Sequence, residues 1–142
     1  GIKSDVTKSS NFPKVWDRLV EIVPREKFKE FGNGQIFGVG YDYLMDEEDS
    51  FIYLAGFDLT DEVKAEELGL DTLSISEKEY AIVSLEGPIP KCIHEGWKYI
   101  ISYFFPKEGY RHDESPDFEV YGDGDPNSED YQMELWVPIL KE

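Results

Sequence analysis

The 142-residue chain fits one domain, because compact domains cluster at roughly 100–150 residues. Hydrophobic residues make up 40% of it, so a core can be buried, and no apolar run approaches the roughly 20 residues that cross a bilayer. The 14 basic residues face 31 acidic ones, and a net charge of −17 repels phosphates, which argues against direct contact with DNA or RNA. A single cysteine, Cys92, suits a reducing compartment. We therefore expect a cytoplasmic domain with no membrane contact.

The first half of the chain predicts one helix followed by two strands. Apolar residues recur at helical spacing after Pro13, and Pro24 ends that pattern. Two segments of strand character follow, joined by an acidic turn over residues 46–50. The expected elements are a helix over 12–23, strands over 35–45 and 51–58, and a linking segment over 59–78.

The second half predicts a strand, a helix and two further strands. Gly87 and Pro88 open the helix, which carries apolar residues at helical spacing until Pro106 ends it. A loop rich in Gly, Asp, Pro and Asn joins the last two strands. The expected elements are a strand over 79–86, a helix over 88–105, and strands over 116–122 and 131–138.

The two halves align with each other when the chain is shifted by 81 positions. The shift places Trp16 on Trp97 and matches the type of every expected element. We therefore expect a duplication, with pseudo-repeats at about 1–58 and 79–139 inside one domain over 1–142. Residues 1–5 fall on the second half of a strand, so the first strand is expected to begin before residue 1.

Alternation along the strands assigns their side chains to two faces of a sheet. We expect one face to pack under the two helices; its apolar residues are Phe37, Val39, Ile52, Leu54, Phe118, Val120, Met133 and Leu135. The opposite face combines glycines, aromatic rings and carboxylates, as small-molecule sites do. Its ligand-binding candidates are Gly38, Gly40, Tyr53, Phe57, Glu119, Tyr121, Glu134 and Trp136.

Glu134 carries the sharpest functional interpretation. A carboxylate between Leu135 and Met133, beside Trp136, would cost several kcal/mol if it were buried, charged and unpaired. A lipophilic cation would match it, with aromatic faces adding about 0.5–2 kcal/mol each. The alternative is an ordinary strand residue that faces water.

The second half resembles the GyrI-like effector-binding domains. The resemblance lies in Tyr80–Val83, Glu86-Gly87-Pro88, Trp97, Asp117–Tyr121 and Glu134–Ile139, in the order and spacing of that family. It implies an α+β fold with duplicated strand–helix–strand–strand units, a concave antiparallel sheet, two long helices and a central cleft. It also implies that the carboxylate aligned with Glu134 binds the ligand.

The resemblance leaves several functions open. Members of the family sense small hydrophobic or cationic ligands for transcription regulators, or bind drugs as free-standing proteins. A DNA-binding module would then lie upstream of Gly1. Others hydrolyse cyclopropane-containing toxins, for which Glu134 would activate water and Tyr53 or Tyr121 would donate a proton. A third group inhibits gyrase.

No cofactor or metal site is expected. Asp123, Asp125, Asn127 and Glu134 match positions of a calcium loop, but Ser128 stands where its sharp turn needs glycine. The two histidines, His94 and His112, lack partners at ligand spacing for zinc. No serine or cysteine lies in a recognisable nucleophile motif.

Overall fold

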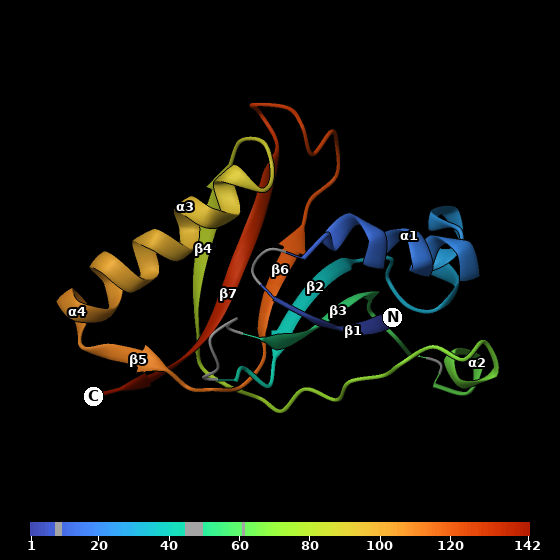
Figure 1. Ribbon diagram of the computed structural model, residues 1–142, viewed down its shortest axis with the longest axis horizontal. Coiled ribbons are helices and arrows are strands. Elements are labelled where there is room, and N and C mark those ends of the chain that lie inside the picture. Colours follow the sequence, from blue (N-terminus) through green and yellow to red (C-terminus); the bar gives the residue numbers. More distant parts are fainter. Residues whose placement is uncertain (8–9, 45–49, 61) are drawn as a thin grey trace. The chain divides into compact units, whose positions relative to one another are not determined.

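The computed structural model describes residues 1–7, 10–44, 50–60 and 62–142 (Figure 1). The chain divides into two compact units, Gly1–Ile75 and Ser76–Glu142. The boundary falls inside the segment expected to link the two pseudo-repeats. Apart from Ser50, the predicted acidic turn over 46–50 lies outside the described residues.

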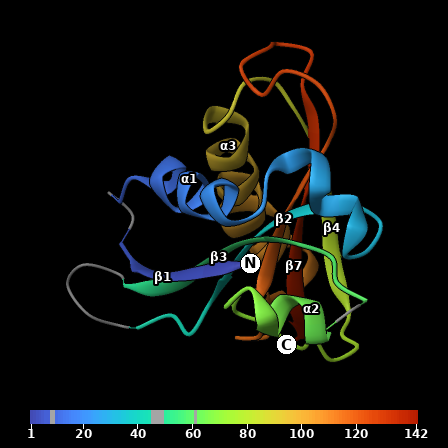
Figure 2. The same ribbon diagram turned by 90° about the vertical axis from the view of Figure 1, so that its right-hand side faces the viewer.

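The first unit builds a three-stranded sheet with one helix on it. Its strands pair antiparallel in the order β1-β3-β2. Figure 2 shows α1 over one face of β1 and β3. The elements in chain order are β1 (Ile2–Val6), α1 (Phe12–Ile22), the short 3₁₀ helix η1 (Arg25–Glu30), β2 (Ile36–Tyr41), β3 (Phe51–Phe57) and α2 (Glu62–Glu67).

Helix α1 begins and ends where the prolines predict. Pro13 lies in its first turn, where a missing N–H costs nothing. The chain becomes extended at Val23, directly before Pro24, because proline disfavours the helical conformation of the residue that precedes it. Val15 and Leu19 on the buried stripe of α1 join the core of this unit. The helix predicted over 12–23 is therefore confirmed.

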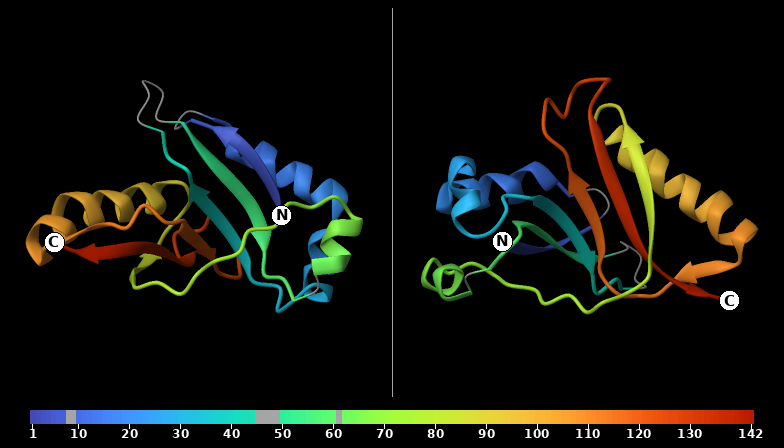
Figure 3. Two further views of the ribbon diagram at one scale, coloured as in Figure 1. Left: turned by 90° about the horizontal axis from the view of Figure 1, so that it is seen from below. Right: turned by 180° about the vertical axis from the view of Figure 1, so that it is seen from behind.

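The second unit repeats this order and adds a short strand. β6, β7 and β4 form an antiparallel sheet in that order, and β5 pairs with β7 as well. Figure 3 shows α3 running along this sheet, and its buried residues share a core with β4 and β7. The elements are β4 (Tyr80–Glu86), α3 (Lys91–Tyr99), η2 (Ile100–Phe104), α4 (Phe105–Glu108), β5 (Tyr110–His112), β6 (Asp117–Tyr121) and β7 (Gln132–Lys141).

The predicted stop of the second helix at Pro106 is wrong. The helix begins at Lys91, widens to a π-helical turn over Ile100–Phe104, and continues through Pro106 to Glu108. Pro106 lies at the start of this last segment, a position that tolerates a missing N–H. Gly109, in the left-handed conformation, ends the helix instead.

The expected fold class is confirmed. Each unit has the order strand–helix–strand–strand, the strands within each unit pair antiparallel, and each sheet carries a helix on one face. Strand β5 and helix α2 were not predicted. Among the described residues, none of the helices has the length and apolar character that crossing a bilayer requires.

Candidate ligand-binding site

Strand pairing in the second unit decides which side chains share a face with Glu134. Directly paired residues of antiparallel strands point to the same side of the sheet. Glu134 is flanked by Val120 on β6 and Ser84 on β4. Two residues further along β7, Trp136 is flanked by Phe118 and Ile82. Helix α3 packs on the other side, so these residues form the helix-free face of the second unit.

The Glu134 carboxylate is held by its neighbour on this face. Trp136 Nε1 donates a hydrogen bond to Glu134 Oε1 over 3.2 Å, and both side chains are half-buried. None of the ion pairs among the described residues involves Glu134. The prediction that Glu134 and Trp136 share a face opposite Met133 and Leu135 is confirmed. The acid therefore offers its charge beside an indole, without an internal cation.

Two aromatic side chains that the sequence interpretation missed complete this face. Tyr80 pairs with Pro138, and its ring lies 5.9 Å from that of Phe118 and 5.7 Å from that of Trp136. Phe118 was expected under the helix, but it pairs with Trp136 and so lies on the helix-free face, where it is buried. Three rings from three neighbouring strands thus stand on the side of the sheet that carries Glu134. The three residues come together because β6, β7 and β4 are neighbours in the sheet, although they are distant in the sequence.

Glu119 and Tyr121 were predicted on the face of Glu134, and this is wrong. They pair with Leu135 and Met133, which lie on the helix side. Tyr121 donates its hydroxyl to Glu119 Oε1 at 2.5 Å. Burial raises the pKa of the Cys92 thiol on α3, and the charges of Glu95 and Glu119 raise it further. The effect of Glu119 on this thiol agrees with its position on the helix side of the sheet. Tyr121 therefore cannot serve as a proton donor in concert with Glu134.

The face assignment in the first unit is also reversed. Tyr53 lies under α1, where its hydroxyl accepts a hydrogen bond from Trp16 Nε1 over 3.2 Å and its ring contacts that of Phe12 at 4.9 Å. Phe57 stacks on Phe28 at 4.3 Å. All of them belong to the core of this unit or pack against it. Tyr53 and Phe57 were predicted on the ligand face, but they face the helix.

The two predicted glycines follow the same correction. Gly38 pairs with Ala55 and Gly40 with Tyr53, so both lie on the helix side and both are buried. Both glycines therefore lie opposite to the face on which the sequence placed them. The helix-free face of the first unit instead carries the residues expected in its core: Phe37, Val39, Ile52 and Leu54.

A one-residue difference between two hairpins explains the failed repeat assignment. Tyr53 follows its partner Gly40 by 13 positions, whereas Met133 follows Tyr121 by 12. The shift of 81 that aligns β2 with β6 therefore becomes 80 between β3 and β7. Because side chains alternate along a strand, residues of β3 and β7 that the shift of 81 matches lie on opposite faces of their sheets. The counterpart of Glu134 is then Leu54 rather than Tyr53, and the acid has no equivalent in the first unit.

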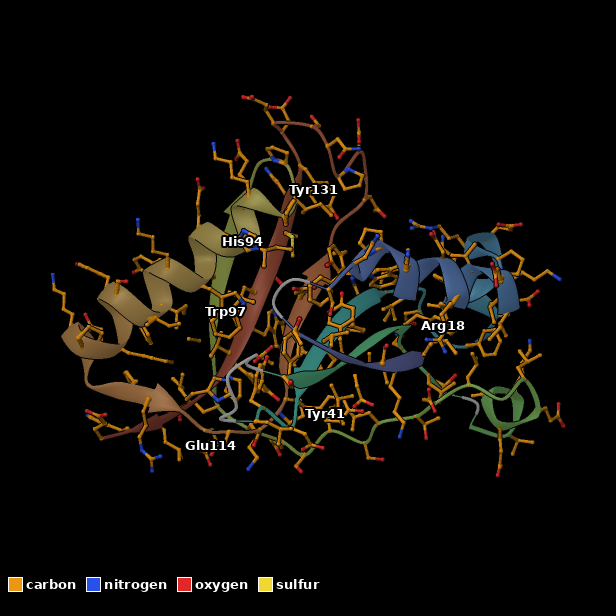
Figure 4. All side chains as sticks on the ribbon, in the orientation of Figure 1. Arg18, Tyr41, His94, Trp97, Glu114 and Tyr131 are labelled. Atoms are coloured by element: carbon orange, nitrogen blue, oxygen red, sulfur yellow. The ribbon has the colours of Figure 1, made fainter. Side chains whose placement is uncertain are left out.

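Asp117, the buried acid among the described residues, is paired with a histidine. His112 Nε2 donates to Asp117 Oδ2 over 3.3 Å, while His112 Nδ1 accepts the backbone N–H of Glu114 over 2.8 Å. These partners orient the imidazole ring, which stacks on Trp97 with centroids 6.4 Å apart. Figure 4 labels Trp97 on α3 and Glu114, which follows β5. The contacts of His112 thus join β5 to β6 and to α3. In the part of the chain that the structure describes, no three His, Cys, Asp or Glu residues gather as metal ligands.

The family model of the GyrI-like small molecule binding domain matches residues 1–140. No curated protein matches the chain.

Solved structures share the fold at low sequence identity. SAV2435, solved with bound tetraphenylphosphonium, is 20% identical with a TM-score of 0.77, over 99% of this chain and 86% of that one. A Staphylococcus aureus protein, named as a candidate for bacterial transcription regulation, is 20% identical with a TM-score of 0.71, over 98% and 89%. An integron cassette protein of Vibrio cholerae is 15% identical with a TM-score of 0.69, over 99% and 88%.

Proposed function

The chain belongs to the GyrI-like small molecule binding domain family, and on this premise we propose that it binds lipophilic cations through Glu134. The observation that carries the proposal is the half-buried carboxylate of Glu134, fixed by the Trp136 indole on the helix-free face of the second unit. Its charge is opposed by no side-chain cation among the described residues. A bound cation would supply the missing countercharge.

The surroundings of Glu134 favour an apolar cation over a hydrated one. Its flanking residues include Val120 and Trp136, and the rings of Phe118 and Tyr80 lie further along the same face. Aromatic faces attract cations by about 0.5–2 kcal/mol each, and they also bury apolar ligand surface. A small hydrated ion would gain little from such walls, whereas a cation with aromatic or alkyl substituents gains from both.

The charge of the whole chain supports the same ligand class. A net charge of −17 raises the local concentration of cations around the domain and repels anions. The solved relative SAV2435 binds tetraphenylphosphonium, and we extend that ligand class to this chain as part of the proposal. We propose that the ligand occupies the cleft that membership of the family implies.

The biological role that we propose is ligand sensing or sequestration in the cytoplasm. In a sensor, DNA contacts would come from a segment outside residues 1–142, because the acidic charge of the chain opposes phosphate binding. In a free-standing protein, the same site would hold a drug or toxin. Both roles use the same chemistry at Glu134.

Substitution of Glu134 by Gln tests the proposal. This change keeps the shape and a hydrogen-bond acceptor for Trp136 but removes the charge, so the Kd for tetraphenylphosphonium should rise at least tenfold, a loss of about 1.4 kcal/mol or more. Isothermal titration calorimetry or quenching of tryptophan fluorescence measures it.

Glu119→Gln is the matched control, because Glu119 lies on the helix side of the same sheet. Its Kd should stay within about twofold of the wild-type value. Equal affinities of the wild type and Glu134→Gln would remove Glu134 from the site. A wild-type chain that binds no lipophilic cation would refute the proposed ligand class.

A further inference from the structure

The geometry points to Tyr80 as a second recognition group, whose hydroxyl donates a hydrogen bond to an acceptor on the ligand. The preferred ligand would then be a lipophilic cation that carries a hydrogen-bond acceptor away from its charge. This inference rests on the proposed function and narrows the class of ligand within it.

Tyr80 stands on the same face as Glu134. It opens β4 and pairs with Pro138, which lies four positions after Glu134 on β7, and even spacing keeps side chains on one side of the sheet. Its ring contacts those of Trp136 and Phe118. Trp136 in turn donates to the Glu134 carboxylate. An unbroken row of side chains therefore connects the phenol with the acid.

The hydroxyl of Tyr80 is unusual among the buried polar groups. Among the buried side-chain oxygen and nitrogen atoms that the structure describes, the hydroxyl oxygen of Tyr80 is the one without a hydrogen-bond partner. Other tyrosine hydroxyls are bonded: Tyr121 donates to Glu119, and Tyr131, labelled in Figure 4, donates to the carbonyl of Gly122 over 3.0 Å. A buried hydroxyl without a partner lowers the stability of the folded state. Such a hydroxyl is therefore a candidate for pairing with a ligand.

The phenol stays a donor at neutral pH. Burial raises the pKa of Tyr80, and the negative charge of Asp113 raises it further. A protonated phenol offers one O–H, which suits a carbonyl, ether or ring-nitrogen acceptor. Because the oxygen is buried, such an acceptor reaches it only when a neighbouring ring turns aside, which the two side-chain dihedrals of an aromatic residue allow.

The spacing of the two groups defines the shape of the ligand. Four residues of strand span about 13 Å. The Tyr80 ring lies 5.7 Å from that of Trp136, which is only two residues from Glu134. A ligand that meets both groups must therefore be elongated, with its charge at one end and its acceptor at the other. Tetraphenylphosphonium has a charge but no acceptor, so it would use only the Glu134 end.

A matched pair of ligands tests the inference. The probes are tetraphenylphosphonium and (4-acetylphenyl)triphenylphosphonium, which differ by one carbonyl-bearing group. The wild-type chain should bind the acetyl compound about fivefold more tightly, as expected for one added hydrogen bond, and in Tyr80→Phe the ratio of the two Kd values should fall to about one. Tyr99→Phe, on an exposed residue of α3, should keep the wild-type ratio.

Each outcome has a defined meaning. A wild-type ratio near one, or a ratio unchanged by Tyr80→Phe, would overturn the role of Tyr80 while leaving Glu134 untouched. A melting temperature several degrees lower in Tyr80→Phe would also overturn it, because the hydroxyl would then have a structural partner. If neither probe binds the wild type, the proposed function itself fails, which is a different result from a lost preference.

Discussion

At the scale of single residues, the two carboxylates of neighbouring strands have different partners because they lie on opposite faces. Glu134 accepts from an indole on the helix-free face, whereas Glu119 accepts from a phenol on the face that α3 covers. Both were expected to bind ligand, and their sequence surroundings are similar: each alternates with apolar and aromatic neighbours. The pairing of β6 with β7 distinguishes them.

Tyr121→Phe tests this distinction. The change removes the donor to Glu119 on the helix side, so the free energy of unfolding should fall by about 1–2 kcal/mol. The Kd for tetraphenylphosphonium should remain within about twofold of the wild-type value. Urea denaturation and calorimetric titration measure the two effects. Strongly weakened binding with unchanged stability would show that Tyr121 faces the ligand after all.

At the scale of elements, each helix buries one residue completely at the equivalent position. Leu19 of α1 and Ile100, the first residue of η2, both have 0% of their surface exposed, and the shift of 81 relates them. Each lies in the core of its own unit. Helices and their covered sheet faces thus form two similar cores, although the strands below them differ by one residue in register.

Alanine substitutions at these two positions measure the cores. Leu19→Ala and Ile100→Ala should each lower the free energy of unfolding by about 2–5 kcal/mol, because both leave a cavity. Ile101→Ala is the control: this neighbour of Ile100 is 61% exposed, and its loss should change stability by less than about 0.5 kcal/mol. Chemical denaturation checks all three. Similar losses at Ile100 and Ile101 would contradict the described helix face.

At the scale of the whole molecule, the excess of acidic residues acts on any charged ligand. The net negative charge of the chain attracts cations over a distance that salt shortens, to about 10 Å at 0.1 M ionic strength. The proposed contact with the half-buried Glu134 would be short, so salt would screen it much less. The two contributions can therefore be separated by ionic strength.

Titrations at low and high salt test this separation. Between about 20 mM and 500 mM NaCl, the Kd for tetraphenylphosphonium should rise roughly threefold, because the long-range attraction is screened. Neutral triphenylphosphine oxide should show no comparable loss. The salt effect should persist in Glu134→Gln, since the other 30 acidic residues remain. An affinity independent of salt would limit the electrostatic contribution to the local contact.

The sequence by itself determined most of the elements and their order. Prolines, helical periodicity and strand alternation placed α1, β2, β3, β4, β6 and β7 close to their observed bounds, since these signals are local. The pairing of Glu134 with Trp136 on one face also followed from alternation within β7.

Only the tertiary structure decided which face of each strand meets a helix. That choice depends on strand pairing, and one residue of difference between the two hairpins reversed it between β3 and β7. For this reason Tyr53, Phe57, Glu119 and Tyr121 changed from expected ligand contacts to groups under the helices. The same pairing brought Tyr80 and Phe118, distant in sequence, beside Trp136.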